Sequence, residues 1–266
     1  MSREQSKHEP VLLAEVLELL EPSAGKVVVD CTGDADIAAF AGAPFVVGDG
    51  LGNMIRVTMM FMLLGVDERA YGGEPRSPEP RHMGRVLTQI HPGELNVWGG
   101  KEEGIDGLSP WDLTRAENEL RKQVVEWVEW AKKDLPGCEG AHLALTSPQL
   151  GVRETRRIVG EYTLSEEDWE KKTIFNDHIG FAYIDKSVPY RSLVPKEIDN
   201  LLVAGRCVSF ERAIQEEIRL IPPCMVTGYA AGVAAAQAVN DGVAPRDLNV
   251  SKLQESLKRS GVNFPK

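Results

Sequence analysis

The sequence predicts an α/β fold in which strand–turn–helix pieces from both ends of the chain build one domain. Two short apolar runs, at residues 26–31 and 201–204, each lead into a glycine-containing turn, which is typical of buried strands in a parallel sheet. After a polar segment, two prolines and a run of small residues at 225–239 predict a helix that packs closely against this sheet.

Composition narrows the class of protein. The 266 residues, 42% of them hydrophobic, are enough for one large or two modest domains. The net charge of −10 argues against a nucleic-acid partner, which requires a basic surface. The longest apolar run, 57–66, is too short to span a membrane. Because the N-terminus has no secretory apolar segment and the four cysteines form no C-x-x-C pair, we expect a cytoplasmic protein with reduced thiols and no metal site.

The first strand–turn–helix piece lies near the N-terminus. The strand at 26–31 leads through a turn containing Gly33 into a helix at 37–41, and Asp34 or Asp36 is placed to cap that helix. This arrangement is half of a nucleotide-binding βαβ unit. A simple strand–helix turn is the alternative interpretation.

The middle of the chain predicts further elements. Residues 57–64 form a candidate buried strand, and 89–90 and 95–98 are shorter candidates. Ser109 caps the clearest helix of the sequence, with Pro110 in its first turn. The apolar stripe of this helix indicates a core element and not a binding surface.

Two groups of polar residues are candidates for chemistry. Arg153, Arg156 and Arg157 lie close together, as in a clamp for an anionic substrate or a cofactor phosphate, although a solvated strand edge gives the same pattern. His178, beside Asp177, is a candidate general acid, with a packed or solvated histidine as the alternative.

The second strand–turn–helix piece lies near the C-terminus. Its strand ends at Gly205, and the N-terminus of the small-residue helix points back at this turn. A helix N-terminus beside a glycine turn favours a negatively polarised ligand atom. An ordinary strand–helix packing unit remains the alternative.

Four stretches, in order, resemble signatures of FAD-dependent oxidoreductases, in the branch related to fumarate reductase-type flavoproteins. The first is the pattern D-x-T-G-D-x-D followed by A-G-A-P. Together they run from Lys26 towards the C-terminus, and they comprise residues 28–45, 151–157, 189–207 and 218–225. Any one stretch is a weak signal, whereas four in the same order are a strong one.

The resemblance implies FAD contacts at three places. These are Thr32, Gly33 and Asp34; Gly205, Arg206 and Cys207; and Pro223, Cys224 and Met225. The first group would lie near the adenosine and the pyrophosphate, and the second near the pyrophosphate and the ribityl chain. A helix beginning at Pro223 would aim its N–H groups at N1 and the C2 carbonyl of the flavin, where a positive helix end stabilises the anionic reduced form.

The resemblance also implies a domain division. Residues 26–45 and 188–266 would form the FAD-binding domain, with 46–187 inserted as an α+β cap or substrate domain after a helical leader at 1–25. The family opens with a strand and a G-x-G-x-x-G turn, which no stretch before Lys26 matches. We therefore expect an incomplete Rossmann-like FAD-binding domain. We also expect weak or absent FAD binding by the isolated chain, or a second chain that supplies the missing half.

A second resemblance covers residues 8–32. This stretch is similar to the N-terminus of S-adenosylmethionine-dependent small-subunit rRNA cytosine methyltransferases. That family continues into a Gly-Gly-His turn, whereas this chain continues into Asp34, Ala35 and Asp36. The chain therefore looks like a junction of two families at a shared strand and turn.

The favoured function is that of an FAD-dependent oxidoreductase, or its C-terminal portion, which passes hydride or electrons between a small organic substrate and flavin. Arg153, Arg156 and Arg219 are the candidates for orienting an anionic substrate or the flavin edge. The alternatives are the methyltransferase, and a cofactor-free fragment or subunit that needs a partner chain. No motif fixes a proton donor.

Overall fold

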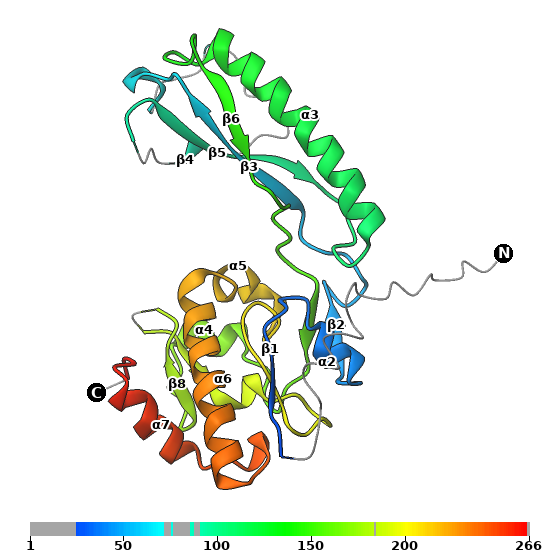
Figure 1. Cartoon of the computed structure of the whole chain (residues 1–266), viewed down its shortest axis with the longest axis vertical. Coiled ribbons are helices and arrows are strands. Elements are labelled where there is room, and N and C mark those ends of the chain that lie inside the picture. The colour runs from blue at the N-terminus through cyan, green and yellow to red at the C-terminus, as the bar shows by residue number, and fades with distance from the viewer. Residues whose placement is uncertain (1–24, 72–75, 77–85, 88–90, 184, 265–266) are drawn as a thin grey trace, which may run out of the picture.

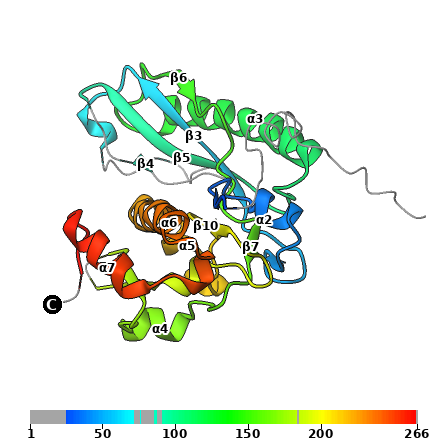
Figure 2. The same ribbon diagram turned by 60° about the horizontal axis from the view of Figure 1, so that its bottom comes forward.

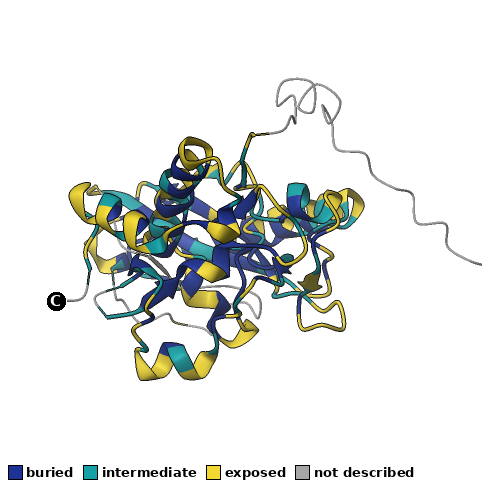
Figure 3. Cartoon of the chain, turned by 90° about the horizontal axis from the view of Figure 1, so that it is seen from below, coloured by how far each residue is buried: buried dark blue, intermediate teal, exposed yellow. Residues whose placement is uncertain are grey.

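The computed structural model describes residues 25–71, 76, 86–87, 91–183 and 185–264, and it contains two hydrophobic cores (Figure 1). The parallel-strand core gathers around β1 (Val28–Asp30), β10 (Leu201–Val203) and α6 (Ile221–Asp241). The α3 core lies between α3 (Pro110–Asp134) and an antiparallel sheet. Figure 3 shows the buried residues in the interior and the exposed ones on the outer helices. The chain thus has the mixed helix and strand content of an α/β protein.

The parallel-strand core joins the two ends of the chain, as the sequence predicts. β1 pairs in parallel with β10, with Val28 opposite Leu201 and Asp30 opposite Val203. Helix α6 contacts both strands on one side and α7 (Val250–Arg259) on another (Figure 2). The close approach is possible because the buried side of α6 consists mainly of alanines, including Ala230, Ala231 and Ala234.

The helix after β1 begins differently from the prediction. α2 (Asp36–Phe40) has Ala35 as its N-cap, in the left-handed conformation with φ 54°, and the side chain of this residue makes no capping hydrogen bond. The expected cap by Asp34 or Asp36 is wrong, because Asp36 is already the first helical residue. Its backbone N–H donates to the Thr32 hydroxyl at 3.0 Å, and Asp34 binds Thr155 instead.

The α3 core confirms the predicted long helix. The Ser109 side chain accepts a hydrogen bond from the Asp112 N–H at 3.3 Å, and Pro110 occupies the first turn. Helix α3 covers one face of a four-stranded sheet with the order β4-β5-β3-β6 (Figure 1). The strands are β3 (Val57–Leu64), β4 (Val86–Leu87), β5 (Glu94–Glu102) and β6 (His142–Thr146).

The remaining elements are short and mostly belong to the parallel-strand core. β2 (Phe45–Val47) pairs with β7 (Arg156–Ile158), and β8 (His178–Phe181) pairs with β9 (Ser187–Pro189), both antiparallel. The short helices are η1 (Glu68–Ala70), α4 (Glu166–Lys171), η2 (Tyr190–Leu193), η3 (Arg212–Ile214), α5 (Gln215–Ile218) and η4 (Pro245–Asp247).

The change from one core to the other lies just before and within β7. Val152 still packs against the α3 core, whereas Ile158, Leu164 and Trp169 belong to the parallel-strand core. Hydrophobic packing therefore changes from one core to the other between Val152 and Ile158.

A buried ion network lies where the chain passes between the cores. The Glu154 carboxylate is fully buried and accepts from Arg157 Nη1 at 2.6 Å and from Arg212 Nε at 3.0 Å. Its second oxygen accepts from the Ile55 N–H at 2.9 Å. Ile55 and Glu154 lie on the two segments that connect the cores, so the network links both segments to Arg212, which precedes α5.

Two sequence expectations lie outside the described residues, namely the leader helix and the strand candidate at 89–90. In the described part of the chain, no single helix is long and apolar enough to cross a membrane. The pair Arg212–Ile218 and Ile221–Asp241 meets that test only when taken together, and it is bent by 91° at its break.

Candidate functional site

A pocket of about 380 Å³ lies at the carboxyl ends of β1 and β10. Ligands of open α/β sheets bind at such strand ends. Three chain segments that are distant in the sequence line the pocket: Cys31, Thr32 and Gly33 after β1; Ala204, Gly205 and Arg206 after β10; and Arg219, Cys224 and Gly228 around the start of α6.

The first turn is held by the buried carboxylate of Asp30. This carboxylate accepts from the Thr32 N–H at 2.9 Å, from the Thr32 hydroxyl at 2.8 Å and from the Ala38 N–H at 2.9 Å. Gly33 has φ +80°, and a Cβ there would lie 3.2 Å from Arg206 Cζ. Glycine is therefore required both by the backbone conformation and by the close approach of the arginine.

The second turn, after β10, is hydrogen-bonded to α6. Gly205, with φ +85°, donates its N–H to the Thr227 hydroxyl at 3.1 Å. That hydroxyl in turn donates to the Pro223 carbonyl at 2.9 Å. The turn after β10 and the first turn of α6 are thus fixed relative to each other on one wall of the pocket.

Two arginines line the pocket. Arg206 forms an ion pair with Asp34, and Arg219 forms one with Glu216. The Nε atoms of both arginines are buried and have no hydrogen-bond partner among the described residues. Guanidinium groups bind carboxylates and phosphates well, so two buried N–H donors without acceptors suit an anionic ligand.

The start of α6 differs from what the resemblance implied. The helix begins at Ile221 and not at Pro223, and Pro222 and Pro223 have no N–H to donate. The Cys224 N–H already donates to the Leu220 carbonyl at 3.1 Å. Few backbone donors are therefore available to a flavin, and the positive helix end acts mainly through its dipole.

The pocket includes only part of the predicted FAD-contact set. Cys207 is fully buried below the pocket, where its thiol donates to the Ala204 carbonyl at 3.6 Å. Burial raises the pKa of this thiol to about 12, so it remains protonated. Pro223 is buried and Met225 is 68% exposed, and neither lines the pocket.

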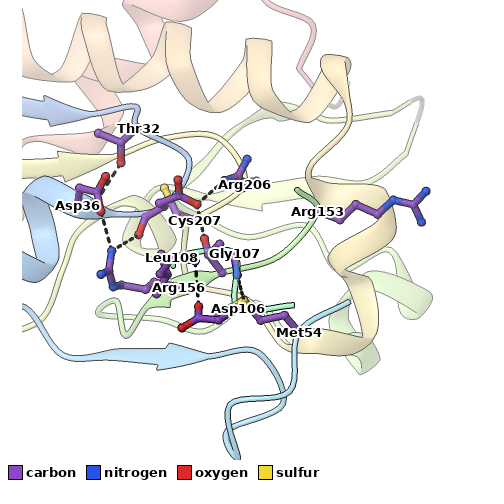
Figure 4. A network of polar contacts seen from close by, with 12 residues as sticks. Thr32, Asp36, Met54, Asp106, Gly107, Leu108, Arg153, Arg156, Arg206 and Cys207 are labelled. Carbon is purple, nitrogen blue, oxygen red and sulfur yellow. Dashed lines mark hydrogen bonds and ion pairs between the residues drawn. The ribbon is translucent and has the colours of Figure 1, made fainter. Parts of the chain in front are cut away.

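The three candidate arginines do not meet at one place. Arg156 supports the first turn from outside, because its Nη1 binds the Asp34 carbonyl at 3.1 Å and the Asp36 carboxylate at 2.7 Å. Figure 4 shows Arg156, Asp36 and Arg206 grouped together, while Arg153 points away from them. Arg219 alone of the three lines the pocket.

Sequence reasoning missed some residues of the site. Thr155 donates to the Asp34 carboxylate at 2.6 Å although the two residues are 121 positions apart, and no sequence signal links them. Cys31 could have been found from its place beside Thr32. Burial raises the pKa of the thiols of Cys31 and Cys224, which makes them weak nucleophiles.

The remaining candidates for chemistry lie outside the pocket. His178 is stacked against Phe264, with the ring centres 4.7 Å apart, and burial lowers its pKa. It does not line the pocket, so the structure gives it no place as a proton donor there. Within the described ranges, no group of three or more His, Cys, Asp or Glu side chains could hold a metal ion.

Comparisons with known proteins agree with this geometry. The family model of FAD dependent oxidoreductases matches residues 15–186 and 183–257. The chain therefore belongs to the FAD dependent oxidoreductase family, whose cofactor is FAD. The match identifies neither the fumarate reductase-type branch nor the methyltransferase family.

Among curated proteins, no relative matches the chain. Among solved structures, the chain is similar to the Diels-Alderase PyrE3 in the biosynthetic pathway of pyrroindomycins, with 13% identity and a TM-score of 0.35. The alignment covers 88% of this chain and 38% of that structure. The chain thus spans less than half of that protein.

Proposed function

We propose that the chain is an FAD-dependent oxidoreductase, or the C-terminal portion of one, and that the pocket between β1, β10 and α6 holds part of the FAD. The observation that carries this proposal is the convergence of three distant segments on one pocket, where two arginine N–H donors have no partner among the described residues. Bound FAD would supply hydride or electron transfer to or from a small organic substrate.

The residues of this chain would bind and orient the cofactor. Arg206 would contact a phosphate or another anionic group through its guanidinium group, and the turns at Gly33 and Gly205 allow a ligand to approach the backbone closely. The positive end of α6 would stabilise negative charge on the reduced flavin. Thr227 and Asp30 would act by keeping both turns in place.

The size of the pocket and the open edge of β1 both favour a second chain as part of the site. Its volume of about 380 Å³ lies at the small end of the range for ligand sites, and FAD is a large dinucleotide. On the side away from β10, β1 pairs with no strand in the described part of the chain. We propose that a second chain adds to this side and completes the dinucleotide site, by the strand addition known from other sheet edges.

The finer assignments are also proposals. The order of the matching stretches supports the fumarate reductase-type branch, and the reduced thiols support a cytoplasmic location. The methyltransferase and the cofactor-free fragment receive no support from the family match. Most of the methyltransferase-like stretch lies outside the described residues.

An FAD titration tests the proposal. Flavin absorbance and fluorescence would be followed as FAD is added to the 266-residue chain and to an Arg206→Gln variant. We expect weak, saturable binding that Arg206→Gln reduces. Arg115→Gln, which removes the same charge from the exposed surface of α3, should leave binding unchanged.

Two results would decide against parts of the proposal. If Arg206→Gln and Arg115→Gln bind FAD alike, the pocket is not the flavin site. Tight stoichiometric binding by the single chain would leave the pocket intact as the site but would exclude the need for a second chain.

A further inference from the structure

A single carboxylate joins two arginines near the pocket. Glu216 Oε1 lies 3.6 Å from Arg153 Nη1, and Oε2 pairs with Arg219 Nη2. Arg219 lines the pocket, whereas Arg153 is attached to the α3 core. The carboxylate therefore lies where the two cores meet, at the edge of the proposed flavin site.

Arg153 does not depend on Glu216 for its position. Its guanidinium carbon lies 4.6 Å from the centre of the Trp98 ring, and its Nη2 lies 3.4 Å from the Thr58 hydroxyl. Its backbone carbonyl accepts from Gln215 at 2.8 Å. These contacts hold a guanidinium whose side chain is only 7% exposed. An arginine fixed in this way is ready to bind an anion.

The local charge is not balanced. Two guanidinium groups face one carboxylate, and Arg56 adds further positive charge near Arg153. Burial lowers the pKa of Arg153, and the Glu216 carboxylate acts in the opposite direction. The Nε of Arg219 also has no partner in the described part of the chain. A second anion, or a better placed one, would be bound favourably here.

Glu216 is held more weakly than Arg153. Its side chain is 50% exposed, and it sits on α5, a helix of only four residues. Ion pairs with an exposed carboxylate contribute little to stability because water screens them and the side chain loses freedom. Arg153 is thus held independently of Glu216, while the carboxylate between the two arginines can move away.

We propose that Glu216 is an internal counter-ion that occupies the place of a substrate carboxylate and is displaced when the substrate binds. The substrate class is then a small carboxylic acid, held as its anion by Arg153 and Arg219. A carboxylate is favoured because each oxygen of Glu216 already faces a different arginine, which is the arrangement that a bound carboxylate would reproduce. The inference rests on the proposed function, since it places the substrate beside the flavin.

Acetate titration of the full chain tests this proposal, with acetamide as a neutral ligand of the same shape. Binding is followed at constant ionic strength through the NMR signals of the arginine Nε–H groups, which Arg153→Lys and Arg219→Lys assign by their loss. Removing an internal competitor raises the apparent affinity, so we expect Glu216→Gln to bind acetate about tenfold more tightly than the unchanged chain.

A matched control separates this effect from a general change in charge. Glu167→Gln removes the same charge from an exposed ion pair on α4 and should bind acetate like the unchanged chain. Adding Arg153→Gln to Glu216→Gln should abolish the gain. Glu216→Ala should behave like Glu216→Gln, which shows that the gain comes from removing the carboxylate.

Equal acetate binding with and without the Glu216 carboxylate would overturn the proposal, and so would equal binding of acetate and acetamide. A loss of thermal stability without any gain in affinity would show that Glu216 only holds the cores together. FAD titration of the same variants reports the flavin site separately, so normal FAD binding without an acetate response overturns only the carboxylate site.

Discussion

The buried Glu154 network allows a demanding prediction about stability. The Glu154 carboxylate is fully buried and compensates the charge of Arg157, whose own side chain is 6% exposed and whose Nε has no partner among the described residues. Glu154→Gln keeps the shape of the side chain but removes its charge. Arg157 would then remain buried without a counter-ion.

The expected magnitude follows from the burial of both groups. Removing one partner of a buried ion pair costs about 3–5 kcal/mol, because the other charge stays desolvated. For a chain of this size each kcal/mol lowers the melting temperature by about 2–4 °C. We therefore expect Glu154→Gln to melt roughly 6–20 °C below the unchanged protein.

Thermal unfolding followed by circular dichroism measures this effect. The matched control is Glu117→Gln, whose exposed pair with Arg121 should contribute at most about 0.5 kcal/mol. Arg157→Met, added to Glu154→Gln, should recover part of the loss because it removes the uncompensated charge. A Glu154→Gln midpoint equal to that of the control would refute the reasoning.

Three further predictions concern the site and its surroundings. Gly33→Ala should lower stability by about 1–2 kcal/mol, because alanine disfavours the left-handed backbone at this position. It should also lower FAD binding, because its Cβ would push against the Arg206 guanidinium 3.2 Å away; unchanged melting and binding would contradict this. Burial and the Asp168 hydrogen bond raise the pKa of Tyr162 to about 12, so its stabilising effect should be complete below pH 10 and disappear as the pH rises towards 12. In urea titrations, Tyr162→Phe should flatten this fall in stability, and an unaltered slope would disprove the link. Iodoacetamide should label Cys31 in the folded protein, slowly because its thiol is a weak nucleophile but measurably because it is exposed, and Cys207 only after unfolding, which mass spectrometry of the peptides can check.

Local signals in the sequence determined the elements and the family. Apolar runs before Gly33 and Gly205 predicted β1 and β10, because glycine permits the left-handed turns that follow them. Ser109 and Pro110 fixed the start of α3 through capping that involves only neighbouring residues. The ordered signatures indicated the flavoprotein family, which the family match confirms.

The tertiary structure alone decided which side chains meet. Arg153 and Arg156 are neighbours in the sequence but separate in the fold, since one packs on Trp98 and the other supports the turn at Asp34. The bond between Thr155 and Asp34 joins residues far apart in the chain. A sequence records spacing along the chain, whereas pairings of this kind depend on how two separately packed cores are placed against each other.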